Sequence, residues 1–398
     1  MKQKITEDLY YIGVADRRIH LFENVYPVND GVTYNSYLLA DENPVIFDTA
    51  DGAFTSAYLE NLNEALDGKT PSYLVVQHME PDHSASIKAL AEKYPEMKIV
   101  VNAKSKIFLE GFFPDLKNEC VVVKDGEELV TGKHTLKFVF APMVHWPEVM
   151  FTYDITDKTL FSADAFGSFG ATGRVTGDEE PFDAYIPEAR RYYSNIVGKY
   201  GVQVTAALKK ASAVEIARVC PLHGKVLTGD RISKAVGLYS KWASYTPEQN
   251  SVVVAYASVY GNTKKAAERL AAKLGEAGVA DVSVYDVSKT HFSYIIADCF
   301  KKSHVVLASV TYNAGIFPAM DNLVREIARH GIANRKFAFI ENGSWAAQSA
   351  KLMREILSEV KGASFIGEPV SFRSTPKAED LAMLDALAEH VAKDVNGN

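Results

Sequence analysis

The sequence contains few cysteines and no arrangement of them that could form a disulfide framework. Cys120, Cys220 and Cys299 are the three cysteines of the 398-residue chain. No two of them form a C-x-x-C pair, which excludes a zinc ribbon and an appended rubredoxin-type iron site. We interpret all three as small buried hydrophobic residues in a reducing compartment.

Long hydrophobic runs and clusters of basic residues are also missing. No apolar run approaches the roughly 18–20 residues that cross a bilayer, and the N-terminal segment has no apolar core like that of a signal peptide. We therefore expect no membrane partner and a cytoplasmic location. The net charge is −7 and Lys and Arg are not clustered, so we expect no nucleic-acid partner.

The chain is longer than one hydrophobic core usually serves, and its pattern changes once. Short strands with turn signals fill the first part, and helical patterns interrupt them at residues 84–94 and 190–208. This pattern predicts a mixed α/β layer fold. Pro247 and Asn250 then lie in a break that is typical of a linker. We predict a first domain at residues 1–246, a linker at 247–251 and a second domain at 252–398.

The second domain alternates regularly between strand and helix patterns. Five strands and five helices in this order predict an α/β domain with a doubly wound parallel sheet. We expect strands at residues 252–256, 282–285, 305–308, 337–340 and 370–372. We expect helices at residues 264–274, 294–300, 320–329, 346–359 and 377–393.

A dense group of metal-ligating side chains follows the apolar run at residues 73–76, which predicts a buried strand. His78, Glu80, Asp82 and His83 fall within six consecutive residues. A strand that ends in a ligand-rich loop is a rigid way to present a metal site. Imidazole suits zinc, iron and copper, whereas added carboxylate favours harder ions such as iron or manganese.

Three more candidate ligands share this position at the end of a predicted strand: His145, Asp164 and His223. Strand ends at one edge of a sheet sandwich converge, so these residues can meet the first four in space. The other histidines lack this setting, and we expect them to be surface or core residues. They are His20, His134, His291, His304, His330 and His390.

Seven donors are too many for one ion and suit two ions that share a bridging carboxylate. Two divalent ions, three carboxylates and one hydroxide sum to zero charge, which favours burial. A zinc pair would activate water for hydrolysis, whereas an iron pair would bind and reduce O2 or NO. Hydrolytic relatives of this layout usually have histidine where this chain has Glu80, which favours iron.

Residues 258–263 lie between a predicted strand and a helix and offer hydroxyls, backbone N–H groups and a helix N-terminus to a phosphate. They match neither G-x-G-x-x-G nor a Walker motif, which disfavours NAD and ATP. Two later strand-end loops add Tyr312 and Trp345, which could flank a flat ring, and together the three loops favour FMN. The expected FMN-binding residues are Ser258, Val259, Tyr260, Gly261, Asn262, Thr263, Val310, Thr311, Tyr312, Asn313, Gly315, Asn342, Gly343, Ser344 and Trp345.

These motifs, in this order, resemble the flavodiiron proteins, also called A-type flavoproteins, over essentially the whole chain. The resemblance implies a metallo-β-lactamase-like αββα sandwich followed by a flavodoxin-like domain. It also implies that one iron takes His78, Glu80 and His145, and that Asp164 bridges to the second iron. The second iron would take Asp82, His83 and His223.

The resemblance further implies an oxidoreductase that reduces O2 to water, NO to N2O, or both, at a diiron centre with electrons relayed by FMN. The donor would be rubredoxin, a rubredoxin reductase system or, in some members, a deazaflavin. A head-to-tail homodimer or a dimer of dimers is expected. Gas preference and donor identity stay open.

The alternatives are a binuclear zinc hydrolase with an accessory flavodoxin domain, and a non-catalytic electron carrier. Tyr192, Tyr193 and Trp146 could line the gas pocket or donate protons, although ordinary aromatic packing is favoured for them.

Overall fold

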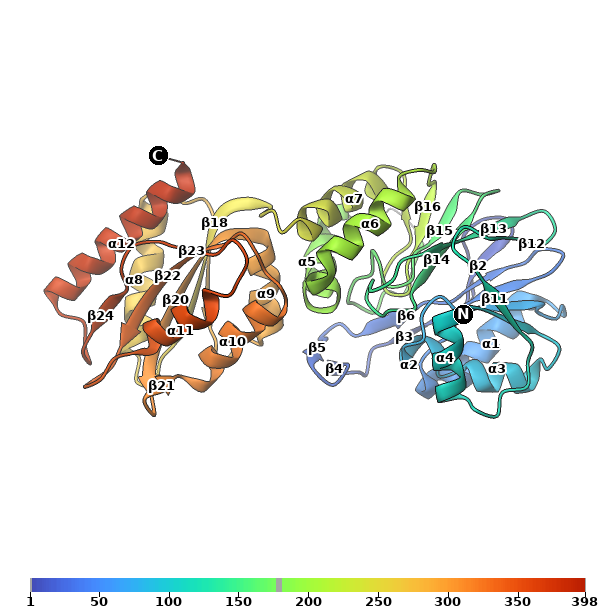
Figure 1. The fold of residues 1–398 in the computed structure, drawn as a ribbon, viewed down its shortest axis with the longest axis horizontal. Coiled ribbons are helices and arrows are strands. Elements are labelled where there is room, and N and C mark those ends of the chain that lie inside the picture. The colour runs from blue at the N-terminus through green and yellow to red at the C-terminus, as the bar shows by residue number, and fades with distance from the viewer. Residues whose placement is uncertain (1, 177–180, 398) are drawn as a thin grey trace. The chain divides into compact units, whose positions relative to one another are not determined.

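The computed structural model describes residues 2–176 and 181–397 and divides the chain into two compact units (Figure 1). The first unit comprises Met1–Tyr193 and Val202–Ser240, and the second comprises Ser194–Gly201 and Lys241–Asn398. The second unit thus includes a short segment from the earlier part of the chain. The Asn195 side-chain amide donates to the Ser293 carbonyl at 3.1 Å, and the Tyr245 hydroxyl donates to the Gly198 carbonyl at 2.9 Å.

The first unit contains two large sheets. The first sheet has the order β1-β2-β7-β8-β9-β10-β11, and its last four strands are parallel. Its strands are β1 (Gln3–Lys4), β2 (Leu9–Tyr11), β7 (Tyr37–Leu39), β8 (Val45–Phe47), β9 (Tyr73–Val75), β10 (Lys98–Asn102) and β11 (Cys120–Val123). Strands β7 to β9 are short and almost fully buried, as expected when both faces of a sheet are covered.

The second sheet has the order β12-β13-β14-β15-β16-β17. The hairpin of its first two strands turns at Gly132, where the sequence pattern predicts a strand pair. Its strands are β12 (Glu128–Val130), β13 (Thr135–Phe140), β14 (Met150–Asp154), β15 (Thr159–Phe161), β16 (Arg218–Cys220) and β17 (Leu227–Thr228). Two small hairpin-like pairs lie outside the large sheets: β3 (Val14–Asp16) with β6 (Val32–Tyr34), and β4 (Leu21–Phe22) with β5 (Tyr26–Pro27).

Aromatic and branched side chains of both sheets fill the layer between them. Phe47 of β8 stacks on Phe161 of β15, with ring centroids 3.7 Å apart. Tyr37 packs against the same Phe161 ring, and its hydroxyl donates to the Pro221 carbonyl at 2.7 Å. This buried aromatic layer fixes the two sheets against each other, and with them the loops that leave their strand ends.

Helices cover the outer faces of both sheets. On the first sheet, helix α4 contacts β10 and β11, and helix α1 contacts β7. On the second sheet, α6 and α7 face β15 and β16 (Figure 1). The helices of this unit are α1 (Thr55–Leu66), α2 (Pro81–Ser84), α3 (Ile87–Lys93), α4 (Ala103–Phe112), α5 (Phe182–Tyr192), α6 (Gly201–Ala211) and α7 (Asp230–Ala243), with a 3-10 turn at Gly52–Phe54.

One helix expected at residues 190–208 is interrupted in the structure. Helix α5 ends at Tyr192, a π-helical stretch covers Tyr193–Val197, and a 3-10 turn covers Gly198–Tyr200 before α6 begins. Residues 190–198 are buried without interruption, so the apolar pattern of the sequence does not show where the helix changes its turn. The helix expected at residues 84–94 is present as α3 at Ile87–Lys93, and only Ser84 of the expected range belongs to the separate helix α2.

The second unit is the predicted doubly wound sheet, with the order β19-β18-β20-β22-β23 and β24 paired to the other half of β22. The predicted strands all exist: β18 (Gln249–Ala257), β19 (Val282–Asp286), β20 (Lys302–Tyr312), β22 (Lys336–Asn342) and β24 (Val370–Phe372). Two short strands, β21 (Gly315–Ile316) and β23 (Ser364–Phe365), were not predicted. Strand β18 begins at Gln249, inside the segment predicted as a linker.

The five predicted helices of this unit are also present, and each packs an apolar stripe on the sheet. In α10, Met320, Leu323, Val324 and Ile327 are buried, which is the spacing of one helical face. The helices are α8 (Asn262–Glu276), α9 (Phe292–Lys301), α10 (Pro318–Arg329), α11 (Ser349–Leu357) and α12 (Ala378–Asn396).

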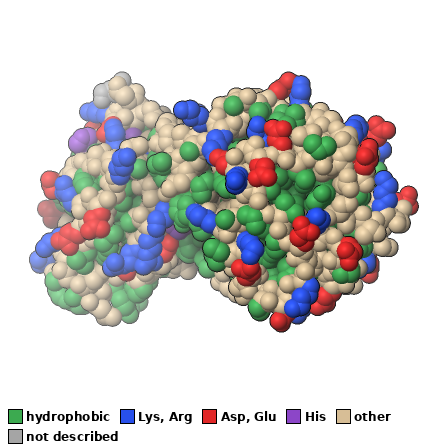
Figure 2. All heavy atoms as spheres, turned by 45° about the vertical axis from the view of Figure 1, so that its right-hand side comes forward, with side chains coloured by type: hydrophobic (Ala, Val, Ile, Leu, Met, Phe, Trp, Pro, Cys, Tyr) green, Lys and Arg blue, Asp and Glu red, His purple; other side chains and the backbone are tan. Residues whose placement is uncertain are grey.

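Surface and helix composition add two observations. No helix in the described ranges is long and apolar enough to cross a membrane. On the face drawn in Figure 2, basic and acidic side chains are interspersed and not gathered by sign.

Candidate functional site

The seven predicted metal ligands come together in the first unit, at the ends of strands of both sheets. The first four follow β9, and Asp82 and His83 lie on the short helix α2, not in a loop as expected. The other three follow β13, β15 and β16. The seven are His78, Glu80, Asp82, His83, His145, Asp164 and His223.

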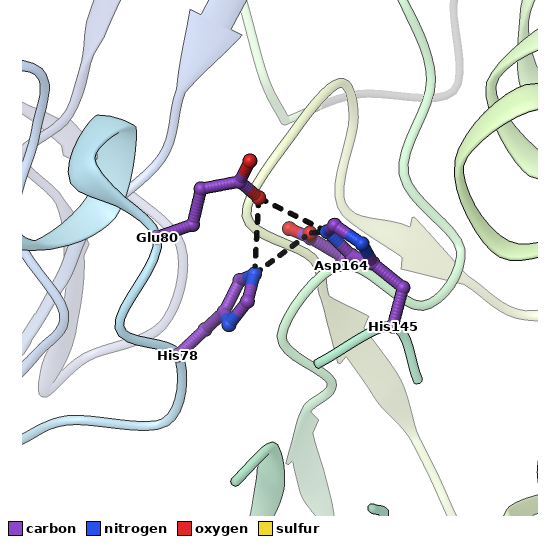
Figure 3. A group of neighbouring side chains, drawn as sticks. All are labelled: His78, Glu80, His145 and Asp164. Carbon is purple, nitrogen blue, oxygen red and sulfur yellow. Dashed lines mark hydrogen bonds and ion pairs between the residues drawn. The ribbon is translucent and has the colours of Figure 1, made fainter. Parts of the chain in front are cut away.

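One group of four side chains surrounds a common point (Figure 3). Glu80 Oε2 lies 3.2 Å from His78 Nε2 and 3.0 Å from His145 Nε2. Asp164 Oδ2 lies 3.4 Å from His78 Nε2 and 3.1 Å from His145 Nε2. Two atoms that each bind one ion at about 2.1 Å lie about 3 Å apart, so this spacing suits a single ion.

A second group lies on the other side of Asp164. Asp82 Oδ2 is 3.3 Å from both His83 Nε2 and His223 Nε2. The two imidazole nitrogens are 3.1 Å from each other. Two nitrogen lone pairs aimed at one point would repel each other unless a proton or a cation lies between them, so this group also suits a metal ion.

Asp164 faces the two groups with different oxygen atoms. Its Oδ2 belongs to the first group, whereas its Oδ1 lies 3.2 Å from His83 Nε2 and 3.7 Å from His223 Nε2. The loop that presents it turns at Ala163 and Phe166, both of which have positive φ angles of 46° and 68°. Such backbone conformations are costly for residues other than glycine and are often found at functional sites. The two oxygens of Asp164 thus face two different groups of candidate ligands.

The electrostatics of the protein match this reading. Burial alone would raise the pKa of Asp164, but His78 and the other imidazoles outweigh it and hold that pKa well below its usual range. Burial alone would lower the pKa of His145, but Asp164 and Glu80 outweigh it and raise the pKa to about 9. The carboxylates thus attract positive charge strongly, and bound divalent cations would supply it in place of protons.

The carboxylate oxygens of the site are also suited to metal binding because several of them have no hydrogen-bond partner in the described part of the protein. Among the described residues, both carboxylate oxygens of Asp82 and of Asp164 are buried without a hydrogen-bond partner. Buried carboxylate oxygens are costly to leave unpaired. One cation held by each group would give these carboxylates a binding partner.

A cavity of about 710 Å³ opens onto these ligands. Glu80, Asp82 and His145 form part of its wall, and Trp146, predicted as a possible lining residue, is another part. Glu23, which we did not predict, also lines the cavity. The cavity gives a small molecule access to the first group.

Two aromatic residues predicted near the site differ in their surroundings. The ring of Tyr192 lies 5.3 Å from the imidazole of His223, and both are fully buried. Tyr193 packs at 4.9 Å against the ring of Tyr239. Tyr192 therefore lies beside a predicted ligand, whereas Tyr193 contacts a neighbouring helix.

A third candidate cluster combines His134, Asp154 and Asp157, although we expected no metal at His134. The His134 imidazole bonds to Asp154 at 2.8 Å and approaches Asp8 at 3.3 Å. Asp8 in turn pairs with Lys133 at 2.5 Å. A lysine already neutralises this cluster, so it is better explained as an ion-pair network that ties the N-terminal segment to the second sheet.

The predicted phosphate loop forms a tight turn at the carboxyl end of β18. The Ser258 hydroxyl accepts a hydrogen bond from the Gly261 N–H at 3.0 Å. Gly261 has a φ of 93° and directly precedes α8, so only glycine adopts this turn without strain. Tyr260 beside it is 94% exposed. An exposed aromatic ring and a free helix N-terminus are suited to a bound phosphate and flat ring.

The second predicted flavin loop is a hairpin between β20 and β21. Tyr312 pairs with Gly315, and Asn313 and Ala314 between them both have positive φ angles, which matches a two-residue hairpin turn. The Thr311 hydroxyl accepts hydrogen bonds from the N–H groups of Gln348, which precedes α11, and of Ser349, its first residue. This side chain therefore caps a helix at the same time as it lies in the loop.

The third predicted flavin loop follows β22 and meets an unpredicted neighbour. Trp345 is 83% exposed. The Asn342 amide donates to the Ser374 carbonyl at 3.0 Å, and its buried Oδ1 has no partner among the described residues. The Ser374 hydroxyl also meets Ser344 at 3.0 Å. The segment after β24 thus belongs beside the three loops, and the unpaired Oδ1 is an acceptor available to a ligand.

Comparison with known proteins agrees with this two-part architecture. The family model for the ODP family beta lactamase matches residues 32–224, and that for flavodoxin matches residues 254–384. The solved flavodiiron protein from Giardia intestinalis superposes with a TM-score of 0.94 at 25% identity, covering 100% of this chain and 97% of that one. Rubredoxin-oxygen oxidoreductase of Megalodesulfovibrio gigas is 30% identical over 98% of this chain and 97% of that protein. The chain belongs to the flavodiiron protein family.

The flavodiiron chain is also 27% identical to the nitric oxide reductase of Moorella thermoacetica, over 98% of its own length and 97% of that protein. The predicted fold class, a metallo-β-lactamase-like sandwich followed by a flavodoxin-like sheet, is confirmed. The flavodoxin domain of a flavodiiron protein implies FMN, and the two groups of side chains are candidates for holding metal ions.

Proposed function

We propose that this flavodiiron protein is an oxidoreductase that reduces O2 to water, NO to N2O, or both. Each O2 takes four electrons and four protons to give two waters, and each pair of NO molecules takes two electrons and two protons to give N2O and one water. The observation that carries the proposal is Asp164, whose two oxygens face two separate ligand groups inside one buried site. A carboxylate-rich binuclear site suits iron better than zinc.

The proposed assignment of ligands follows the two groups. His78, Glu80 and His145 would hold one iron, and Asp164 would bridge to the second, which the remaining three would hold. When bound, the iron pair supplies gas binding and reduction, and FMN supplies electrons one at a time. The remaining three ligands are Asp82, His83 and His223.

The cavity beside the candidate ligands has a mixed wall. Phe22 and Trp146 line it together with polar side chains such as Asn24 and Asp51. Tyr34 also lines it. Burial raises the pKa of Tyr34 well above its ordinary value, so the hydroxyl keeps its proton at neutral pH.

The flavin site is proposed from the three loops and the free helix N-terminus. The loops would hold FMN through the residues predicted for them, with Thr311 acting through its cap on α11. The similarity to the rubredoxin-oxygen oxidoreductase of Megalodesulfovibrio gigas supports rubredoxin as the class of electron donor. We propose a head-to-tail homodimer or a dimer of dimers, and domains at residues 1–246 and 252–398 joined at 247–251.

Elemental analysis and parallel gas kinetics test the proposal. The purified protein should contain about two irons and one FMN per chain. With a chemically reduced donor under anaerobic conditions, it should consume O2, NO or both. Zinc in place of iron, together with hydrolase activity, would instead support the binuclear hydrolase with an accessory flavodoxin domain. Unchanged gas consumption after His83→Ala would favour a simple electron carrier.

A further inference from the structure

A buried carboxylate outside the seven ligands contacts one of them directly. The side chain of Glu148 is fully buried. Its Oε1 meets His78 Nδ1 at 2.9 Å and accepts a hydrogen bond from the Met79 N–H, also at 2.9 Å. Its Oε2 has no hydrogen-bond partner among the described residues. A buried carboxylate is costly unless it is paired, which suggests that its contact with His78 has a role.

The position of Glu148 is fixed by the fold and not by a long loop. The Asn102 side-chain amide donates to the Glu148 carbonyl at 2.5 Å. The oxygen of the same Asn102 side chain caps α4 by accepting from the N–H groups of Lys104 and Ser105. Glu148 lies two residues before β14. A helix cap on one side and a sheet strand on the other thus hold this carboxylate against His78.

The contact decides which nitrogen of His78 is protonated. A carboxylate at Nδ1 requires that Nδ1 carry the hydrogen, which leaves the Nε2 lone pair directed at Glu80 and Asp164. The other buried imidazoles are supported differently. His223 Nδ1 meets the backbone carbonyl of Thr33 at 2.7 Å, and His83 Nδ1 has no hydrogen-bond partner in the described part of the chain. Among these three, His78 alone has a carboxyl group at its Nδ1.

We propose that Glu148 is a positioning residue that makes the two metal positions unequal. It holds His78 with Nε2 toward the metal and adds negative charge beside the position of His78, Glu80 and His145. An anionic partner makes an imidazole a stronger donor, and nearby negative charge favours the more oxidised ion. This position therefore binds its ion more tightly, and has a lower reduction potential, than it would without Glu148. The iron identity rests on the proposed function; the inequality of the two positions does not.

The test compares three variants of the full chain with FMN bound. Glu148→Gln keeps an acceptor near His78 but removes the charge, and Glu148→Asp keeps the charge with a shorter side chain. Asp154→Asn is the matched control, because Asp154 is a buried carboxylate on the Nδ1 of His134, at the far end of β14. Metal-free protein is titrated anaerobically with ferrous iron, and the potentials are followed by electron paramagnetic resonance.

In Glu148→Gln we expect one site to lose about 10- to 100-fold in iron affinity, as is typical for an outer partner of a ligand, while the second site stays unchanged. The reduction potential of that one site should rise, and the other should stay unchanged. Glu148→Asp should retain more affinity than Glu148→Gln, and Asp154→Asn should retain all of it. Circular dichroism and FMN content serve as folding checks, and if Glu148→Gln fails them, the comparison of Glu148→Asp with wild type decides.

Three results would overturn the inference: unchanged affinity and potential in Glu148→Gln, equal weakening of both sites, or the same loss in Asp154→Asn. A wild-type protein that binds two irons but reduces neither gas would refute the proposed function and leave this inference intact. Failure of the two proposals is therefore distinguishable.

Discussion

At the scale of single residues, Asp164 has more consequences than any other side chain in the site. Each of its oxygens belongs to a different ligand group, and both are buried. Loss of this side chain removes one donor from each group, whereas loss of His223 removes a donor mainly from the second. Variants at these two positions can therefore show whether one carboxylate serves two ions.

The first prediction follows from this difference. Asp164→Ala should reduce iron content at both positions, and His223→Ala should reduce it mainly at one. Gas turnover in Asp164→Ala should fall by more than the roughly 10- to 100-fold that is typical of outer-shell changes. Iron per chain is measured by mass spectrometry after gel filtration. Retention of two irons in Asp164→Ala would contradict the bridging role.

Some residues of the candidate site can be predicted from the sequence, and others cannot. The rule that ligands follow strands identified seven residues that the structure brings together. The same rule could have identified Asp48, which follows β8 and accepts hydrogen bonds from the backbone N–H groups of Gln77 and His78. Glu148 follows no strand. Its role depends on a contact 70 positions away in the sequence, which no local pattern contains.

At the scale of elements, periodicity predicted the second unit better than the first. Its parallel strands are continuous apolar runs and its helices have clear apolar stripes, so existence and order were predictable. The strands of the first unit are as short as two or three residues, and tertiary packing, not local propensity, decides where they begin. The break after Tyr192 escaped prediction because residues 190–198 are buried on all sides, so no apolar stripe marks where the helix changes its turn.

The hairpin of β12 and β13 yields a prediction about acid stability. Asp41 accepts hydrogen bonds from the Thr131 hydroxyl and from two backbone N–H groups of the turn. Burial would raise the pKa of Asp41, but these bonds outweigh it and lower the pKa from 3.8 to about 2. The carboxylate therefore stabilises the fold above its unfolded pKa of 3.8, and this contribution is lost as the pH falls through about 2.

Asp41→Asn should lower the free energy of unfolding by about 1–2 kcal/mol at neutral pH. The difference from wild type should shrink as the pH falls below about 4. Urea unfolding of both proteins across this range measures it. Asp67→Asn, a change at an exposed helix end, is the control and should stay within about 0.5 kcal/mol. A difference that grows toward acid pH would contradict the account.

Helix α11 and the flavin hairpin share the Thr311 hydroxyl. Thr311→Val removes the acceptor for the N–H groups of Gln348 and Ser349, so it should lower the free energy of unfolding by about 1 kcal/mol. It should also weaken FMN binding without changing iron content. Fluorescence titration of FMN measures the effect. Ser358→Ala, at the other end of the same helix, should leave FMN affinity unchanged, and an equal loss there would refute the link.

At the scale of the whole molecule, the predicted metal ligands and the predicted flavin loops fall in different units. Removal of FMN should therefore leave both irons in place but abolish gas turnover with a reduced protein donor, and added FMN should restore it. Iron content and turnover are measured on the same sample. Loss of iron together with FMN would show that the two sites do not assemble independently.

Association is the second question at this scale. If one protomer's flavin serves its partner's irons, turnover per chain should fall when the protein is diluted until it dissociates. Light scattering and gas consumption, measured over the same concentration series, check this expectation. A strictly monomeric protein with full turnover would contradict the head-to-tail dimer.

The segment Ser194–Gly201 has a practical consequence for anyone who would divide this protein. It precedes the last metal ligand in the chain, yet it packs with the unit that follows, through Asn195 and the Tyr245 hydroxyl. In a chimera joined near residue 246, this segment would come from one parent protein, and most of the residues that it packs against would come from the other. Exchange of flavin halves between relatives should therefore succeed only when residues 194–201 are exchanged with them.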